Sequence, residues 1–291
     1  MRFKWLYFAI SLLVMIPGMI SLAVFGLRLS IDFTGGSLLE LKASTSLNQS
    51  VFSDMAKAKN LELSVVQTAD DNTYLLRFKP ITQDQQTAYV EELDKLLNTK
   101  MTVLRFESVG PTMGAELAQK AVLAVIVASV CIIAYIAWSF RHIPRPYTSW
   151  KFGVSAVIAL LHDVIVLLGL FSIFGHFYHA EVDTLFVTAV LTVIGFSVHD
   201  TIVVFDRVRE NLPKLPRATF SQVVDFSLTE TLNRSLNTSL TVTLTLTALL
   251  LFGGETIRWF VVALLVGIIS GTFSSIFNAA PILVLWEQKQ K

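Results

Sequence analysis

Charge and cysteine are the two things that this chain has little of. Charged residues make up 15% of its 291 residues, whereas soluble domains average about 25%. The single cysteine, Cys131, excludes an intrachain disulfide framework and a zinc-ribbon or iron–sulfur ligand set. A net charge of +1 gives no bulk attraction to polyanions, which excludes a nucleic-acid-binding domain of the basic type.

Motifs of the common enzyme classes are missing as well. The sequence has no Gly-x-x-x-x-Gly-Lys-Ser/Thr loop for ATP, no His-Glu-x-x-His zinc motif and no Gly-x-Ser-x-Gly nucleophile motif. His176, His179, Glu181 and Asp183 could bind a metal, but their spacing is loose, and a solvated polar loop explains them better. We therefore predict a protein that is not an enzyme and needs no cofactor or metal.

What the chain has in excess is apolar sequence, with 53% hydrophobic residues and a mean hydropathy of +0.62. A transmembrane helix needs about 20 mostly apolar residues. Six stretches qualify, at residues 5–27, 117–140, 152–174, 185–205, 235–252 and 259–286. The first has the basic start of a signal peptide, but its uncharged stretch exceeds the about 7–15 residues of a signal core, so we expect a retained helix.

Lysine and arginine in the short flanks predict the orientation. The loops at residues 175–183 and 253–258 hold Arg258 alone. The opposite flanks hold Arg2, Lys4, Arg141, Arg145, Lys151, Arg207, Arg209, Lys214, Arg217, Lys289 and Lys291. Because the positive side is cytoplasmic, both termini are expected inside and residues 30–115 outside.

Residues 30–115 are polar enough to form a separate domain, and strand-like and helix-like runs alternate along them. We predict strands at 31–41, 61–68, 73–79 and 101–109, and helices at 51–59 and 82–98. Ser50 is the predicted N-cap of the first helix, and residues 69–72 form the turn between the middle strands. The order β-α-β-β-α-β is that of a split βαβ, or ferredoxin-like, α+β fold.

The domain organisation follows from these segments. Residues 1–29 form the N-terminal tail and first transmembrane helix, residues 30–115 the outer domain, and residues 116–291 a five-helix transmembrane bundle with a C-terminal tail. Pro213 and Pro216 interrupt the continuation of the fourth span. Residues 220–232 are expected to form a short helix at the cytoplasmic interface.

Three charged residues within or at the edge of spans are the candidates for function, because an ionisable group at membrane depth costs about 2.5–3.5 kcal/mol to insert. They are Asp163 in the third span, Asp200 in the fourth and Arg234 at the start of the fifth. A purely structural role stays open for all three, and for Asp200 the neighbouring His199 and Thr201 are possible hydrogen-bond partners. Asp163 fits a structural acid bonded to neighbouring helices, and Arg234 fits an interfacial residue that reaches lipid phosphates.

The fifth span is unusually polar, and we expect it to face Asp200 with hydrogen-bond donors. Asn233, Asn237 and Thr241 share one face of a helix. Ser239, Thr243 and Thr247 share another. Such a helix is poorly suited to face lipid.

Several motifs together give a resemblance that covers the whole chain. They are DFTGG at residues 32–36, GPTMGAEL at 110–117, GFSVHDTIVVFDRVREN at 195–211, NRSLNTS at 233–239 and FGG at 252–254. The set resembles the SecD/SecF family of bacterial protein-export membrane proteins, within the resistance–nodulation–division superfamily. The set is specific, although each motif alone is weak.

The resemblance implies an accessory role in Sec-dependent export across the bacterial cytoplasmic membrane, driven by the proton gradient. The implied partners are a SecD chain, the SecYEG channel, YajC, the exported preprotein and membrane lipid, with no nucleic acid. Asp200 and Arg234 match the proton-responsive pair of the family. His199 stands where the family usually has asparagine, so a second titratable group can share the proton. Asp163 and Asn237 are secondary candidates.

Two other functions stay open at this point. A half-sized relative could export small molecules by the same proton chemistry. A purely structural scaffold of a channel complex would tolerate neutral substitution of Asp200 and Arg234.

Overall fold

The computed structural model describes residues 3–68, 72–141, 143 and 147–288. The chain forms two compact units. One consists of residues 29–122, and the other of residues 1–28 and 123–291. Four of the basic residues that predict the orientation, Arg2, Arg145, Lys289 and Lys291, lie outside the described residues.

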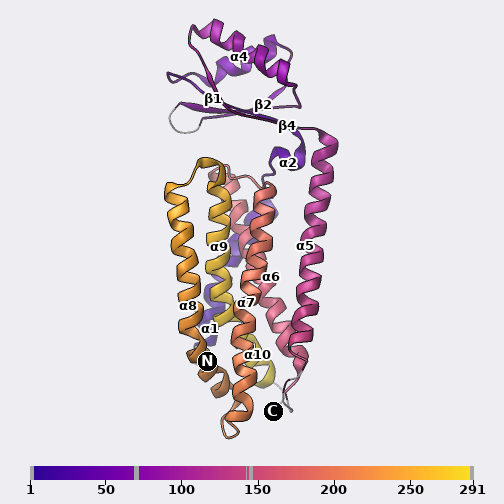
Figure 1. Cartoon of the computed structure of the whole chain (residues 1–291), viewed down its shortest axis with the longest axis vertical. Helices are drawn as coiled ribbons and strands as arrows, with labels where there is room; N and C mark the ends of the chain where they lie inside the picture. The colour runs from indigo at the N-terminus through magenta and orange to yellow at the C-terminus, as the bar shows by residue number, and fades with distance from the viewer. Residues whose placement is uncertain (1–2, 69–71, 142, 144–146, 289–291) are drawn as a thin grey trace. The chain divides into compact units, whose positions relative to one another are not determined.

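Six helices are long and apolar enough to cross a membrane, as predicted. They are α1 (Lys4–Phe25), α5 (Pro111–Ser139), α6 (Ser149–Phe177), α7 (Thr184–Lys214), α8 (Phe220–Phe252) and a last span that consists of α9 (Arg258–Ser274), the π-helical turn η2 (Ser275–Ala279) and α10 (Ala280–Gln288). The first of these helices begins, and the last one ends, at the same end of the bundle (Figure 1). Apart from α1, which has 22 residues, the helices are longer than the predicted spans because they continue beyond the apolar stretch.

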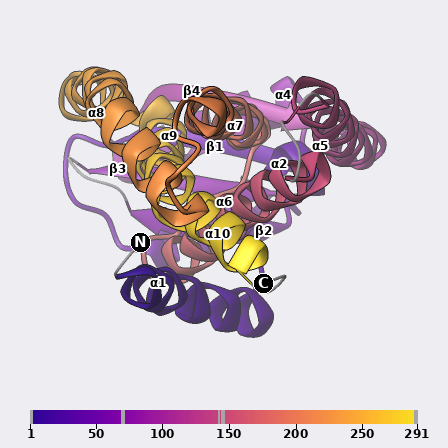
Figure 2. The same cartoon turned by 90° about the horizontal axis from the view of Figure 1, so that it is seen from below.

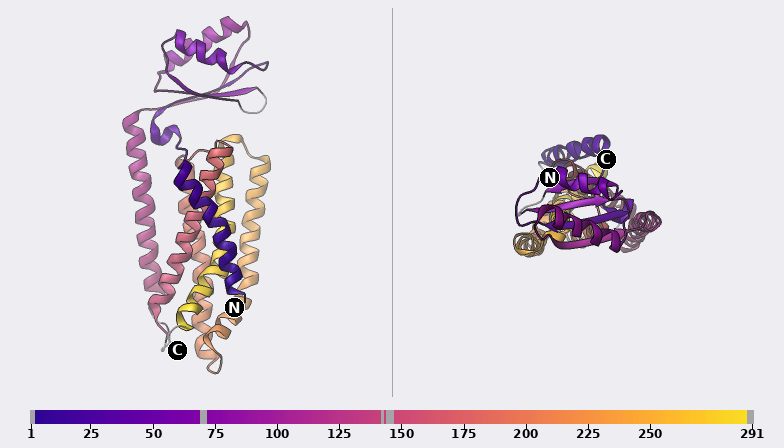
Figure 3. Two further views of the ribbon diagram at one scale, coloured as in Figure 1. Left: turned by 180° about the vertical axis from the view of Figure 1, so that it is seen from behind. Right: turned by 90° about the horizontal axis from the view of Figure 1, so that it is seen from above.

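The helices α6, α7 and α9 form the centre of the bundle, with α8 packed on α7 and α9 (Figure 2). The helix α1 crosses the face of α6 (Figure 3). Two glycines allow this crossing: a Cβ atom built on Gly18 would lie 3.0 Å from the Cα atom of Gly169. Small residues are the usual means of close helix approach in membranes. The first span is therefore held against the bundle at backbone contact.

The helix α8 corrects one prediction. Residues 220–232 are not a separate interfacial helix, because α8 runs without a break over 33 residues. It starts at a capping box, in which the Thr219 side chain accepts from the backbone of Gln222 and the Gln222 side chain accepts from that of Thr219. Neither glycine nor proline follows before Gly253, so helix propagation meets no obstacle. The helix α7, in turn, passes through Pro213 and ends at Lys214.

The unit of residues 29–122 contains a four-stranded antiparallel sheet in the order β2-β3-β1-β4. Its elements are β1 (Gly36–Lys42), α3 (Gln49–Ala58), β2 (Leu63–Thr68), β3 (Thr73–Phe78), α4 (Gln83–Leu97) and β4 (Thr102–Val109). This order and pairing confirm the ferredoxin-like prediction. The predicted turn at residues 69–72 lies mostly outside the described residues.

The core of this unit lies between one face of the sheet and its two helices. Alternate residues of the central strands, such as Leu39 and Leu76, are completely buried against Phe52 of α3. The hydroxyl of Tyr89 on α4 donates to the carbonyl oxygen of Phe52 at 2.8 Å and so ties the two helices together. Burial raises the pKa of the Tyr89 phenol, which keeps it a donor.

Two local predictions in this unit were wrong. Residues 31–34 form a short helical turn, α2 (Ile31–Thr34), because the Ser30 hydroxyl accepts from the backbone N–H of Asp32. The N-cap of α3 is Asn48, whose side chain accepts from the backbone N–H of Ser50. In both cases the side chain that caps the helix stands two residues before the amide that it binds.

Candidate functional site

Asp163 of α6 is the centre of a buried polar cluster in the bundle. Its carboxylate accepts hydrogen bonds from Ser197 of α7 at 2.6 Å, from Ser274 of α9 at 2.6 Å and from Ser270 of α9 at 2.8 Å. His162 supplies a fourth contact from Nδ1 at 3.1 Å. Asp163 is 1% exposed. Four partners satisfy the acceptor capacity of a carboxylate, which supports the interpretation of Asp163 as an acid that joins neighbouring helices.

Asp200 of α7 is equally buried, at 3% exposure, but it is not satisfied. Among the described residues its Oδ2 atom has no hydrogen-bond partner, and neither has the hydroxyl of Ser235 on the adjacent helix α8. The two side chains are near enough for an electrostatic interaction, as is His199. A buried carboxylate with an unpartnered oxygen is costly when charged, and binding a proton reduces that cost.

The other predicted site residues lie on the outer surface of this chain. His199, Arg234 and Asn237 are exposed, and within the described residues Arg234 forms no ion pair with Asp200. The inward face of α8 carries Ser235 and Ser239 instead of the predicted stripe of Asn237 and Thr241. The chain thus brings Asp200 together with Ser235 and leaves the other three candidates on its surface.

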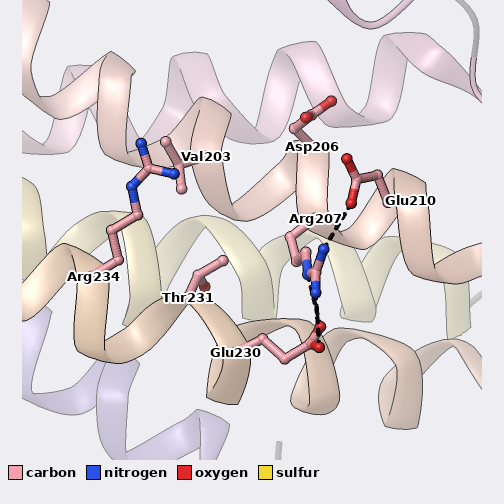
Figure 4. Close-up of a pocket in the computed structure, with 7 residues that line it drawn as sticks. All are labelled: Val203, Asp206, Arg207, Glu210, Glu230, Thr231 and Arg234. Carbon is pink, nitrogen blue, oxygen red and sulfur yellow. Dashed lines mark hydrogen bonds and ion pairs between the residues drawn. The ribbon is translucent and has the colours of Figure 1, made fainter.

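Arg234 lines an open pocket of about 270 Å³ between α7 and α8 (Figure 4). At the other end of this pocket, Arg207 donates to both carboxylate oxygens of Glu230, at 2.7 and 2.8 Å, and to Glu210 at 2.8 Å. Asn211 donates to the same Glu230 at 2.7 Å. The guanidinium of Arg234 points away from these acids and toward Val203 (Figure 4). It is therefore outside the ion-pair network that fixes Arg207.

The four residues considered as a metal site, at the end of α6 and in the loop that follows it, have other partners. The ring of His176 stacks on Phe25 at 3.9 Å, and Asp183 accepts from the backbone N–H of Phe186 at 2.7 Å as the N-cap of α7. Arg28 contacts both His179, at 2.7 Å, and Glu181, at 3.6 Å. Burial lowers the pKa of the Arg28 guanidinium. These contacts fasten the end of α1 to the loop.

Sequence reasoning missed the serines that surround Asp163. Ser270 and Ser274 stand in the last span, where Gly267 and Gly271 indicate only close packing of helices. The signal was present in the spacing, because residues 270 and 274 share one helix face and are polar in an apolar span. A Cβ atom on Gly271 would lie 3.1 Å from that of Ser197, so this glycine lets α7 approach the serines.

The arrangement can perform one kind of chemistry, which is reversible protonation inside the bundle. Asp200 offers a carboxylate that is removed from water and has no fixed counter-ion among the described residues. Asp163 offers a second carboxylate, held by hydrogen bonds from α7 and α9. No covalent step is indicated by these groups.

Comparison with protein families gives two matches. The family described as "Protein export membrane protein SecD/SecF, C-terminal" matches residues 89–289. The family described as "SecD/SecF GG Motif" matches residues 20–46, which include the glycine pair Gly35 and Gly36. Both glycines have positive φ angles, of 71° and 127°. A Cβ atom on Gly114 would lie 2.8 Å from the backbone nitrogen of Gly35, so the pair also permits a close backbone approach.

Similar proteins cover the chain almost completely. "Protein translocase subunit SecF" of Anaerolinea thermophila is 47% identical over 98% of this chain and 92% of its own length. The protein of the same name from Haemophilus influenzae is 35% identical over 97% of this chain and 84% of its own length. The crystal structure of SecDF, described as a translocon-associated membrane protein from Thermus thermophilus, has a TM-score of 0.83 and 33% identity, over 99% of this chain and 38% of that chain. The chain belongs to the SecD/SecF family of protein-export membrane proteins.

Proposed function

We propose that this chain is an accessory subunit of the Sec protein translocase, which uses the proton gradient to promote export of preproteins across the bacterial cytoplasmic membrane. The names of its relatives and its six spans support this role. The observation that carries the proton-coupled part is Asp200, a membrane-buried carboxylate with an unpartnered oxygen among the described residues. Such groups mark ion and proton paths in membrane proteins.

In the proposed relay, Asp200 binds and releases the proton, and Arg234 and His199 modulate it from neighbouring positions. Arg234 lies outside the Arg207–Glu230 network, so its side chain can turn toward a charged Asp200 and away from a neutral one. One charge moved across the membrane yields about 2.3 kcal/mol per 100 mV. That energy is sufficient to bias a two-state packing of α7 and α8 by more than tenfold. Asp163 and Asn237 are secondary members of the relay.

A second chain is needed to complete this site. The outer faces of α7 and α8 carry polar stripes at membrane depth, with Thr188, Thr192 and His199 on α7 and Arg234, Thr238 and Thr241 on α8. The threonine hydroxyls are satisfied by carbonyl oxygens of their own helices, but the histidine, the arginine and Asn237 are poorly suited to lipid.

We propose that a SecD chain packs against these polar stripes and shields them from lipid. The Thermus thermophilus relative is named SecDF, and this chain corresponds to 35% of its length. Beyond SecD, the proposed partners are the SecYEG channel, the preprotein and surrounding lipid, with YajC as a further candidate.

We expect residues 30–115 to face the outside and both termini to face the cytoplasm. Gln49 lies on the surface of α3, and Lys214, at the end of α7, is well exposed. In a variant with Cys131→Ser, a membrane-impermeant thiol reagent applied to intact spheroplasts should label Gln49→Cys and spare Lys214→Cys. Inverted vesicles should give the opposite pattern. Labelling of both positions from one face would contradict the topology.

Arg234→Met is expected to reduce proton-dependent export at least tenfold, because the charged form of Asp200 then has no cation to stabilise it. Export of a secreted reporter is measured in cells depleted of the native copy, with membrane levels checked in parallel. Arg209→Met is the matched control, since Arg209 forms a surface pair with Asp206 at 2.6 Å and such pairs contribute little. If Arg234 acts only through Asp200, Arg234→Met should add almost nothing to Asp200→Asn. Full export by Arg234→Met would remove Arg234 from the relay.

A further inference from the structure

Four polar side chains form a chain of hydrogen bonds from the first span into the bundle. Asn278 of η2 donates from Nδ2 to the Ser11 hydroxyl of α1 at 3.0 Å. The Ser11 oxygen lies 2.5 Å from Nε2 of His162, and Nδ1 of the same ring lies 3.1 Å from Asp163. The four residues come from three elements, α1, α6 and η2, and meet where α1 packs on α6. This chain of hydrogen bonds is separate from Asp200, which lies beside Ser235.

For a neutral His162, the donor and the acceptor of each of these hydrogen bonds can be assigned. Asp163 accepts from three serine hydroxyls and therefore acts as an acceptor toward His162 as well. The imidazole proton is then on Nδ1, and Nε2 is the acceptor. Ser11 donates its hydroxyl proton to Nε2 and accepts from Asn278. One group stays without a partner, because the Asn278 Oδ1 atom is buried and makes no hydrogen bond within the described residues.

When His162 carries a second proton, the same hydrogen bonds can form with donors and acceptors exchanged. The added proton occupies the lone pair of Nε2, which now donates to Ser11. The Ser11 hydroxyl must then turn to another acceptor. A rotation of the Asn278 amide places its Oδ1 atom where Nδ2 stands now, since the two ends of an amide have nearly the same shape. Apart from the N–H bond at Nε2, no covalent bond is made or broken.

We propose that His162 is a second proton-binding site of this protein, in which one proton reverses the hydrogen bonds that join the first span to α6 and η2. Asp163 is the counter-ion of the protonated imidazole. Its three serine donors hold the carboxylate in place in both states. The π-helical turn at Ser275–Ala279 supports the proposal, because such turns are frequent at functional sites and this one supplies Asn278.

The surroundings isolate His162 from other charges. Asp163 is the one ionisable group that contacts it among the described residues. The others on the helices packed against α6 are elsewhere: Lys4 and Tyr7 near the start of α1, Asp200 beside Ser235, the exposed His199 of α7, residues 206–214 at the end of α7, Arg258 at the start of α9, and Glu287 paired with Lys151. On the remaining side lies an apolar pocket of about 490 Å³, with Val14, Val166 and Leu265 in its wall. The His162 side chain is 12% exposed and lines this pocket, so the ring meets an apolar space on that side and no second charge among the described lining residues.

The order Asp163, His162, Ser11 is also that of a serine hydrolase triad, but the surroundings do not fit that reaction. Ser11 lies in the middle of α1, where each backbone N–H is bonded within the helix. No backbone donors are thus free to stabilise an oxyanion beside this serine in the described helix. The group that contacts the Ser11 oxygen is the Asn278 amide, which the proton-driven reversal uses.

The test uses the full chain in lipid nanodiscs, with ¹⁵N-labelled histidine and NMR between about pH 5 and 8, where histidine changes charge. The His162 signal is assigned by its absence in His162→Gln. We expect a neutral ring with its proton on Nδ1 at high pH and a doubly protonated ring at low pH. Asn278→Leu should weaken proton binding by about tenfold, because the turned Ser11 hydroxyl then has no acceptor.

A second measurement reports on the first span. Spin labels at Leu13→Cys and Leu161→Cys, both exposed positions on α1 and α6, are placed in a Cys131→Ser background. The distance between them should change at the same pH as the NMR signal, and His162→Gln should abolish that change. Asp200→Asn should leave both readouts unaltered, which separates this proposal from the relay at Asp200.

Three results would overturn the inference. One is a His162 ring that keeps a single protonation state across the whole pH range. Another is a titration that Asn278→Leu does not shift. The third is a change in label distance that persists in His162→Gln.

Discussion

Asp200→Asn is expected to abolish proton-dependent export while the protein stays inserted and folded. Asparagine keeps the volume of the side chain and its hydrogen-bonding capacity but cannot bind or release a proton. The native carboxylate has an unpartnered oxygen in a buried position among the described residues, and insertion of such a charge costs about 2.5–3.5 kcal/mol. Membrane levels should therefore be equal to or higher than those of the native protein. Export of a secreted reporter in depleted cells, compared with and without an uncoupler, measures the effect.

The size of the loss distinguishes a relay from a scaffold. A proton-coupled subunit without its titrating group should give the same low export with and without the uncoupler. A scaffold would keep normal export, because nothing in the described packing around Asp200 depends on its charge. Asp206→Asn is a matched control on the same helix, since Asp206 forms a half-exposed pair with Arg209. Normal proton-dependent export by Asp200→Asn would remove Asp200 from the proposed mechanism.

His199→Asn extends this comparison, because it removes the second titratable group beside Asp200 and keeps a polar side chain there. The exposed position of His199 places it on the face assigned to a partner chain and not inside this bundle. From that face its ring is still near enough to Asp200 for an electrostatic interaction. We expect His199→Asn to keep export and to shift its pH dependence.

Hydropathy and periodicity predicted the six spans and the ferredoxin-like unit because both patterns reflect burial by the environment. Lipid selects a long apolar run, and a sheet with one buried face selects the alternation of buried and less buried residues seen in β3. Helix ends were less predictable. Asn48 and Ser50 are both good capping residues, and only the backbone path decides which of them caps α3.

The polar interior of the bundle could be predicted only in part. Asp163 and Asp200 stand out in the sequence because each is a lone acid in an apolar run. Their different surroundings depend on which helix faces which, and no local pattern contains that information. The partners of Asp163 come from positions 197, 270 and 274. The outward position of Asn237 likewise follows from the packing of α8 on α9, where Ser239 bonds to Thr272 at 2.6 Å.

Asp163→Leu is expected to cause the largest loss of stability of any single change in the bundle. It removes the acceptor of three serine hydroxyls, which lie between α6, α7 and α9, and of His162, which lies beside α1. Each buried donor left unpaired costs about 1–3 kcal/mol. The sum approaches the whole stability of an ordinary domain, about 5–15 kcal/mol. The measurement is the temperature at which the detergent-solubilised protein aggregates, together with its level in the membrane.

Asp163→Asn keeps the shape of the side chain but changes its charge and its hydrogen-bonding groups. Comparison with Asp163→Leu therefore separates these two contributions to stability. The amide keeps one acceptor oxygen but turns a donor toward hydroxyls that already donate, so part of the loss should remain. Asp200→Asn, made in the next helix at similar burial, should have the opposite sign and leave stability unchanged or raised. The two buried aspartates are thus expected to differ in how substitution by asparagine changes stability. Four donors surround Asp163, whereas one oxygen of Asp200 has no partner within the described residues. Equal stability of Asp163→Asn and the native protein would show that the serine cluster does not hold the helices together.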